Sequence, residues 1–579
     1  MAHRGPDGAG LWDGGNVVMA HRRLIVIDPS PLAHQPFLSP RGPVLVYNGE
    51  LYNDAEVRAA LLARGVRTRT QSDTETVLLA LETWGEAAFA RLRGMYALAY
   101  YDPNRKQLLL ARDPLGVKPL YWRRVRNGEH TDIAFASELK PLACMTAERP
   151  RPDLVAVSGY LTTIRTTLGE RTLFDGISTV LPGELLTINL GGRQPVVMRS
   201  KVLPRAPQAV GGLNGWSVSD VKDAITESVH VHLRSDVPTC SLLSGGLDSS
   251  IIASLAMAES GRLSTYCSGA PTAEAGDDFS YARQVAAHLG SSHTEAPVTR
   301  EMFSQRWSDM VSAAGVPLST PNEVAINEVA RRLRAQGNIV ALSGEGADEL
   351  FGGYDMALAA AARFEQAGGG DGGQFHLNEI AWTPMNVKQD VLEDDAWRSL
   401  ERDSALIESY RTEFATAAAE RTDDDHPLQP HLRFMRRVNL AGLLLRLDSA
   451  TMLAGVEGRT PFADSVICDG AEGMAMALKF QPGTEAAGPV HRTKIALREA
   501  FAPLLPAPVL ARSKASFPLP FTTWLGDQSE VVRQSLLVRS LFTVAAVEAV
   551  CARPAQLWRL AWPMMNLALW GESGTVRTW

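Results

Sequence analysis

A run of serine, glycine and aspartate at Ser244–Ser250 carries the clearest chemical signal in the sequence. Its two glycines let the backbone approach phosphate oxygens without a Cβ clash, and their N–H groups can point at an anion. Serine hydroxyls add donors, and the helix expected to follow directs its positive dipole end at the same place. The pattern predicts a phosphate-binding loop made of Ser244, Gly245, Gly246, Leu247, Asp248, Ser249 and Ser250.

Asp248 is the unusual member of this loop. A carboxylate beside phosphates is favourable mainly as a ligand of Mg²⁺, so we assign Asp248 to a metal site. The alternative is a plain Ser/Gly turn whose aspartate caps the following helix. The sequence has no GxxxxGK[ST] motif, which leaves γ-phosphoryl transfer of the kinase or GTPase kind without support.

A second motif, Ser343–Tyr354, reads Ser-Gly-Glu-Gly-Ala-Asp-Glu-Leu-Phe-Gly-Gly-Tyr. The carboxylates of Glu345, Asp348 and Glu349 are close in sequence and would repel one another unless a cation or a proton lies between them. A magnesium pyrophosphate would supply that cation. A solvated acidic turn is the alternative interpretation.

The elements that must position both motifs alternate between short apolar strands and helices from Ser217 onward. We expect strands at Thr239–Leu243, Leu263–Ser268 and Asn338–Leu342, and helices at Val221–Leu233 and Ser249–Glu259. Such alternation predicts a doubly wound parallel α/β sheet. Each motif follows a strand, which places it at the carboxyl edge where such sheets bind ligands. The chain after the second motif is expected to be mostly helical.

The first 190 residues read largely as β structure interrupted by Gly and Pro. Apolar runs occur at Val44–Tyr47, Ala97–Tyr101 and Gln107–Ala111, and helical spacing occurs at Asp54–Arg64 and Asp73–Trp84. A polar stretch containing Gly and Pro follows and is typical of a linker. We predict an N-terminal domain over residues 1–190, a linker over 191–216 and a C-terminal domain over 217–579.

Both motifs resemble those of the asparagine synthetase family, and the first resembles the pyrophosphate loop of N-type ATP pyrophosphatases. The resemblance continues through Arg446–Asp448, Glu457–Phe462 and Arg492–Arg498. It implies an ATP pyrophosphatase domain with a helical C-terminal part. It also implies an enzyme that uses ATP and Mg²⁺ to adenylate a carboxylate and release pyrophosphate.

The same resemblance implies roles for single residues. Ser343 and Gly344 would complete the pyrophosphate site, and Asp348 would be the second Mg²⁺ ligand. Glu345 would lie near the activated carboxylate and the attacking amine. Lys494 would neutralise the α-phosphate and the departing pyrophosphate, although taken alone it reads as a surface lysine.

The N-terminal domain resembles the Ntn-type αββα glutaminase of the same family. The matching segments are His3–Asp7, His21–Leu24, Tyr47–Asn53, Ser72–Glu75 and Arg112–Gly116. By this resemblance Arg23 holds the glutamine carboxylate, while Glu50 and Asp73 hold its ammonium. Asn48 and Gly49 would form the oxyanion hole.

The family's glutaminase needs a cysteine as its first mature residue, and that residue is missing here. The sequence begins Met1-Ala2-His3, and its first cysteine is Cys144. By resemblance, an opening strand and the nucleophile would precede His3. One explanation is a truncated chain or a start assigned too late, and the other is a true loss, as in the β-lactam synthetase relatives. The retained glutamine-binding residues favour the first explanation.

The amino-acid composition limits the classes of binding partner that we expect for this protein. The chain has 57 basic and 64 acidic residues, so nothing electrostatic favours nucleic acid or an anionic membrane. Its five scattered cysteines form no CxxC pair, which is typical of a reducing compartment. Without a transmembrane-length run or signal-peptide pattern, we expect a cytoplasmic protein, with a homodimer as a possible assembly.

These observations predict an asparagine synthase: ATP adenylates the side-chain carboxylate of aspartate, and ammonia then attacks to give asparagine, AMP and pyrophosphate. In the complete family enzyme glutamine supplies the ammonia, whereas we expect this chain to depend on ammonia itself. An amide or lactam ligase acting on another carboxylic acid is the alternative, since Gly315–Asn322 lacks the acidic residue that often begins this family segment. A non-catalytic scaffold is the alternative of another class.

Overall fold

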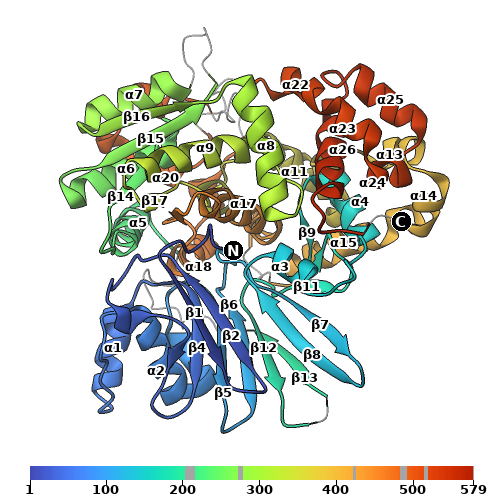
Figure 1. Cartoon of the computed structure of the whole chain (residues 1–579). Helices are drawn as coiled ribbons and strands as arrows, with labels where there is room; N and C mark the ends of the chain where they lie inside the picture. Colours follow the sequence, from blue (N-terminus) through green and yellow to red (C-terminus); the bar gives the residue numbers. More distant parts are fainter. Residues whose placement is uncertain are drawn as a thin grey trace.

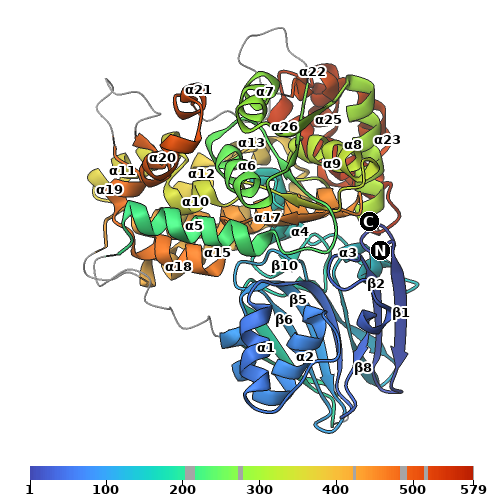
Figure 2. The same ribbon diagram turned by 90° about the vertical axis from the view of Figure 1, so that its left-hand side faces the viewer.

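The computed structural model shows two joined bodies, with the N-terminal strands in the lower body and most later helices in the upper one (Figure 1). The structure describes residues 1–192, 194–201, 215–270, 278–420, 425–482, 492–513 and 519–577. The chain's N-terminus lies near the junction of the two bodies in both ribbon views (Figures 1 and 2).

The N-terminal domain is built on two antiparallel sheets and a hairpin. The six-stranded sheet has the order β13-β12-β6-β5-β4-β3, and the five-stranded sheet has the order β8-β7-β11-β10-β9. Helices α1 and α2 cover one face of the six-stranded sheet (Figure 2). A second apolar core fills the space between the sheets.

The strands of this domain are β1 (Gly8–Asp13), β2 (Val18–Arg23), β3 (Phe37–Leu38), β4 (Val44–Leu51), β5 (Gly94–Asp102), β6 (Gln107–Arg112), β7 (Tyr121–Asn127), β8 (His130–Ala136), β9 (Thr167–Leu168), β10 (Arg171–Thr172), β11 (Ile177–Thr179), β12 (Glu184–Asn189) and β13 (Val196–Lys201). Its helices are α1 (Asp54–Leu62), α2 (Asp73–Trp84), α3 (Leu139–Cys144) and α4 (Leu154–Thr163).

The C-terminal domain contains the predicted parallel sheet, with the strand order β16-β15-β14-β17-β18. Its strands are β14 (Thr239–Leu242), β15 (Ser264–Gly269), β16 (Ser292–Pro297), β17 (Val340–Leu342) and β18 (Glu457–Arg459). The helices around it include α5 (Val218–His232), α6 (Leu247–Ser260), α7 (Asp278–Leu289), α8 (Arg300–Ala314) and α9 (Asn322–Ala335). The two sequence motifs follow β14 and β17, which are hydrogen-bonded neighbours.

After the second motif the described chain is nearly all helical, as expected. The helices are α10 (Ala347–Phe351), α11 (Asp355–Gln366), α12 (Gly372–Glu379), α13 (Met385–Val391), α14 (Asp394–Ser399), α15 (Ser404–Ala419), α16 (Gln429–Phe434), α17 (Ala441–Met452), α18 (Ser465–Gly473), α19 (Met476–Lys479), α20 (Ile495–Phe501), α21 (Ala507–Leu510), α22 (Phe521–Trp524), α23 (Ser529–Gln534), α24 (Leu536–Leu541), α25 (Val544–Ala552) and α26 (Trp558–Gly571). A π-helical turn, Met435–Leu440, joins α16 to α17.

The largest apolar core does not respect the sequence boundary that we placed near residue 190. It combines side chains of α3 and α4 with those of α8 and α26, including Tyr160, Trp307 and Trp562. The rings of Trp307 and Trp562 stack with centroids 4.5 Å apart. Strand β13 also continues the N-terminal sheet beyond residue 190, and residues 202–214 of the predicted linker lie outside the described residues.

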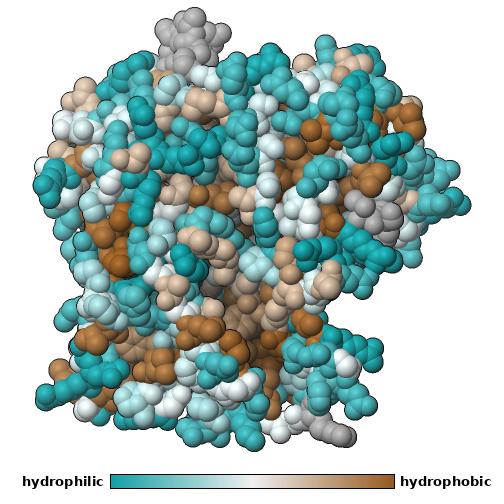
Figure 3. All heavy atoms as spheres, viewed as in Figure 1, coloured by the Kyte–Doolittle hydropathy of each residue, from teal (hydrophilic) through white to brown (hydrophobic). Residues whose placement is uncertain are grey.

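The surface of the molecule is mainly hydrophilic in the view of Figure 3, and apolar atoms gather around the junction of the two bodies. Within the described part of the chain, no helix has both the length and the apolar character needed to cross a membrane.

A fully buried ion pair fastens α4 to the helical region around α13. The ammonium of Lys388 donates to Asp403 at 2.7 Å and to the hydroxyl of Ser158 at 2.7 Å. The same hydroxyl donates to Asp403 at 2.5 Å. Burial lowers the pKa of Lys388 to about 8, against the opposing effect of Asp403.

Replacing Lys388 by Met should leave the Asp403 carboxylate buried without its cation, and removing one partner of such a pair costs about 3–5 kcal/mol. We expect the urea midpoint of unfolding to fall accordingly. The double variant Lys388→Met/Asp403→Leu should recover most of the loss, because it removes both charges. Equal losses in the single and double variants would contradict this account.

Candidate active site

The predicted phosphate loop lies at the carboxyl end of β14 and opens into a cavity of about 410 Å³, here called the loop cavity. Gly245 adopts a φ of +69°, and a Cβ there would lie 2.5 Å from the backbone of Tyr281. The chain can therefore turn this tightly only with glycine. The turn directs the first turn of α6, which begins at Leu247, toward the cavity.

The second motif packs directly on the first. Gly344 approaches α6 so closely that a Cβ would lie 2.9 Å from the backbone nitrogen of Ser249. Ser343 donates its backbone N–H to the carbonyl of Arg459 at 2.8 Å, which fixes the motif between β17 and β18. Both motifs therefore line one cavity at the carboxyl ends of two neighbouring strands, β14 and β17.

Lys494 joins the two candidate metal ligands. Its ammonium lies 2.6 Å from Asp248 and 2.7 Å from Asp348, and it is nearly buried. Burial alone would lower the pKa of Lys494, but the two carboxylates outweigh it and raise the pKa above its ordinary value. Lys494 has a left-handed backbone (φ +50°) directly before α20, a conformation that is uncommon outside glycine.

Glu345 faces the same cavity and is held by Arg446 of α17. The guanidinium donates to the Glu345 carboxylate at 2.6 Å and to the hydroxyl of Thr320 at 3.4 Å. Burial would lower the pKa of Arg446, but the nearby carboxylates, Glu345 first, raise it. Arg446 thus holds the Glu345 side chain in one position at the cavity wall.

Most of the predicted loop residues line this cavity, with two exceptions. Gly245 packs against Tyr281, and Ser250 is fully buried behind the loop. The predicted residues that line the cavity are Ser244, Gly246, Leu247, Asp248, Ser249, Ser343, Gly344, Glu345, Asp348 and Lys494.

Besides Arg446, two further arginines at the cavity were not identified as site residues from the sequence. Arg512 donates to the carbonyl of Ser244 at 2.9 Å, pairs with Asp278 and lies over the ring of Tyr281. Arg498 of α20 also lines the cavity. Both lie near family-like segments of the sequence, but nothing in those segments shows that the chain folds back onto the loop.

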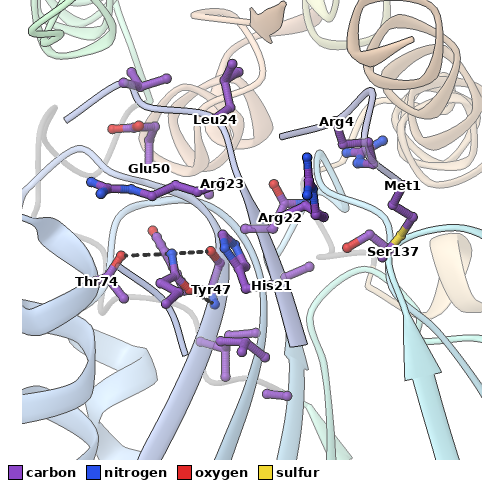
Figure 4. A pocket seen from close by; sticks show the side chains of 18 of the residues that line it. Met1, Arg4, His21, Arg22, Arg23, Leu24, Tyr47, Glu50, Thr74 and Ser137 are labelled. Atoms are coloured by element: carbon purple, nitrogen blue, oxygen red, sulfur yellow. Dashed lines mark hydrogen bonds between the residues drawn. The ribbon is translucent and has the colours of Figure 1, made fainter. Parts of the chain in front are cut away.

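A separate pocket of about 150 Å³ lies in the N-terminal domain, and Figure 4 shows its side chains. It contains all five predicted glutamine-binding residues, namely Arg23, Asn48, Gly49, Glu50 and Asp73. Met452 and Glu457 of the C-terminal domain also line it. We call it the N-terminal pocket, although both domains build it.

Backbone groups fix the polar side chains of this pocket. Arg23 donates to the carbonyls of Ile27 and Asp28, at 3.1 and 2.5 Å, so its guanidinium is held in one orientation. Among the described residues, the buried amide nitrogen of Asn48 has no hydrogen-bond partner. An unused donor inside a pocket is what an oxyanion hole requires.

The acidic side of the N-terminal pocket depends on an arginine from the other domain. Arg459, fully buried in β18, lies 3.3 Å from Glu50 and 2.8 Å from Glu457. Burial raises the pKa of Glu50 well above its ordinary value, and Arg459 is the main group opposing that rise. Burial also raises the pKa of Asp73, to about 6, although Asp73 accepts a hydrogen bond from the backbone of Leu51.

Comparisons with known proteins agree with this geometry. A family model described as asparagine synthase matches residues 220–572, and a glutamine amidotransferase domain model matches residues 1–198. Asparagine synthetase [glutamine-hydrolyzing] 1 of Bacillus subtilis is 30% identical over 98% of this chain and 92% of its own length. Asparagine synthetase B of Escherichia coli is 27% identical, covering 94% and 82%. Amidase chry2 of Gibberella zeae is 27% identical, covering 91% and 84%.

An amidotransferase domain with its own pocket, joined to a parallel-sheet domain with a loop cavity, defines a two-domain amide-forming ligase. The chain belongs to the asparagine synthase family. It is a ligase of that family, which forms amides at the expense of ATP. The predicted family, fold class and reaction type are confirmed.

Replacing Arg459 by Met should leave the buried Glu50 and Glu457 without their shared cation. We expect a loss of about 3–5 kcal/mol in unfolding free energy, measured by urea denaturation. The matched control is Arg398→Met, which removes an exposed ion pair to Asp395 and should leave the midpoint unchanged. If the two variants behaved alike, the buried network would not hold the domains together.

Proposed function

We propose that this enzyme converts aspartate to asparagine. A side-chain carboxylate oxygen of aspartate attacks the α-phosphorus of ATP, and the bond to the bridging oxygen breaks to release pyrophosphate. The nitrogen of ammonia then attacks the acyl carbon, loses a proton and expels AMP. The convergence of Lys494, Asp248 and Asp348 beside a glycine loop supports this proposal most strongly.

Each proposed role follows from a contact in the loop cavity. The backbone of Gly246 and the hydroxyls of Ser244 and Ser249 bind the pyrophosphate. Lys494 stabilises the negative charge that develops on the α-phosphate and on the leaving group. Glu345, held by Arg446, lies at the cavity wall where it can orient the attacking ammonia and accept a proton.

Mg²⁺ fits the pair Asp248 and Asp348. Both carboxylates already pair with one ammonium, which supports a cation-binding role for them. Two carboxylates with phosphate oxygens from ATP form the oxygen ligand set that Mg²⁺ prefers. When bound, the ion would neutralise charge on the phosphates, while Lys494 would remain beside them.

We propose that the N-terminal pocket binds glutamine, which is the source of ammonia in the complete family enzyme. Arg23 would pair with the glutamine carboxylate, and Glu50 and Asp73 with its ammonium. Asn48 would donate to the oxyanion of the amide carbon from its unpaired amide group. In the complete family enzyme, these roles would make the two pockets the donor site and the acceptor site of one reaction.

Replacing Lys494 by Met should lower aspartate-dependent ATP–pyrophosphate exchange by at least about 100-fold, because a preorganised cation at the developing charge is lost. Lys494→Arg should retain part of the activity. A surface control, Lys222→Met on α5, should match the wild type. Wild-type exchange rates in Lys494→Met, with an unchanged unfolding midpoint, would refute the assigned role.

Glutamine affinity should rise as the pH increases through about 6. Asp73 is protonated below its pKa of about 6 and can pair with an ammonium only above it. Its charged neighbours are Asp54, Glu457 and Arg234, together with Glu50 across the pocket. Calorimetric titration between about pH 5 and 7 checks this prediction. Asp73→Asn should bind weakly with little pH dependence, and a steep profile in that variant would contradict the assignment.

A further inference from the structure

A second cavity continues from the loop cavity on the side of α17. Its volume is about 340 Å³, and Tyr354, Leu443 and Arg446 line both cavities. The shared residues include Arg446, whose guanidinium holds Glu345. A molecule whose reacting group lies beside Glu345 can therefore extend directly into this second cavity, here called the apolar cavity.

The walls of the apolar cavity are mostly hydrocarbon and aromatic. The apolar side chains that line it include those of Ile164, Val316, Leu318, Phe375, Ile380, Trp382, Phe434, Met435 and Leu443. Met435 belongs to the π-helical turn between α16 and α17. Such turns are rare and often occur at functional sites, because they re-aim the side chains that follow.

Polar groups at the margins of the apolar cavity already bind one another. Glu323 accepts from the backbone of Ser319 at 2.6 Å and from its hydroxyl at 2.7 Å. Farther along, Arg165 donates to the hydroxyl of Tyr410 at 3.0 Å and to the side-chain oxygen of Asn439.

A hydrogen-bonded chain of His376, His431 and Glu365 reaches another part of the wall of the apolar cavity, which His376 lines. His376 lies 2.9 Å from His431, which lies 2.9 Å from the carboxylate of Glu365. Burial lowers the pKa of His376 to about 3, so its ring adds no charge to the cavity at neutral pH. What remains open to an occupant is therefore largely apolar surface.

The apolar cavity favours an alkyl or aryl group over the charged amino-acid end of aspartate. An ammonium or carboxylate buried there would lose its hydration and find few free partners, which is costly. An alkyl or aryl group would gain free energy from burial at roughly 25 cal/mol per Å² of apolar area.

We propose that the apolar cavity receives the body of the acceptor acid, so that this enzyme also amidates carboxylic acids carrying a bulky alkyl or aryl group. The inference rests on the proposed function of the loop cavity. The carboxylate oxygen attacks the α-phosphorus and pyrophosphate leaves, and ammonia then displaces AMP, while the apolar group stays in the second cavity. The Gly315–Asn322 stretch, which departs from the family pattern, forms part of its wall.

Exchange of pyrophosphate into ATP tests the proposal with three acids: L-aspartate, hexanoate and 3-phenylpropanoate. We expect all three to support exchange above the background without acid. Exchange with aspartate alone would overturn the inference and leave the proposed function intact. Exchange with the apolar acids alone would support the inference and overturn the assignment of aspartate. Absence of exchange with every acid would refute the proposed function itself.

A variant that fills the apolar cavity tests whether the apolar acid binds there. Gly442 lies in α17, and the nearest atoms to a Cβ there would belong to Arg165, at ordinary contact distances from 3.6 Å. Gly442→Phe should lower kcat/KM for 3-phenylpropanoate by about 10-fold or more relative to aspartate. Gly442→Ala is the matched control, since it adds one methyl group and favours the helix.

Two outcomes of this comparison contradict the proposal. If Gly442→Phe lowered kcat/KM for both acids equally, with a normal unfolding midpoint, the apolar acid would not lie in this cavity. If Gly442→Phe changed kcat/KM for neither acid, the apolar acid would again not lie in this cavity. Should Gly442→Phe fail to fold, Val316→Trp fills the cavity from the loop after α8 and gives the same test.

Discussion

The junction of the two domains depends on one buried guanidinium. Arg459 contacts carboxylates from both domains, Glu50 and Glu457, and also donates to the carbonyls of His232 and Arg234. Its own carbonyl accepts from Ser343, the first residue of the second motif. Because the guanidinium and both carboxylates are buried, they cannot exchange this pairing for water. The N-terminal pocket and the second motif therefore both depend on Arg459, the first on its guanidinium and the second on its backbone carbonyl.

The loop cavity shows how charge balance shapes the second site. Asp248 and Asp348 lie in the first turns of α6 and α10, which follow neighbouring strands, and they would repel each other without Lys494 between them. The lysine lies on a third segment, immediately before α20. If ATP binds here as proposed, it adds negative charge to the cavity, and a Mg²⁺ ion would offset part of that charge.

The sequence predicted the elements better than their contacts. Strong local patterns located β14, β17 and α2, because apolar periodicity and glycine turns are encoded within a few residues. The tight turn between β14 and α6 was predicted for the same reason. The roles of Arg446 and Arg512 were not predicted, because each reaches the cavity from a helix or loop that is distant in sequence.

Domain boundaries also depend on long-range contacts, which local pattern does not encode. Helix α4 lies within the range assigned to the first domain, yet its side chains pack in the core of the second. The contribution of Glu457 to the N-terminal pocket is of the same kind. Its segment was recognised by its motif, but only the pairing of β17 with β18 shows where its carboxylate points.

The packing of α26 against α4 has a consequence for biosynthesis. Helix α26 supplies Trp562 and its neighbours to a core that includes Tyr160, so this core cannot close until α26 has left the ribosome. Pairings this distant in sequence form slowly and leave apolar surface exposed meanwhile. The early strands can fold as they emerge, whereas α4 must wait. Nascent chains of this enzyme should therefore be natural clients of chaperones until the final helix is in place.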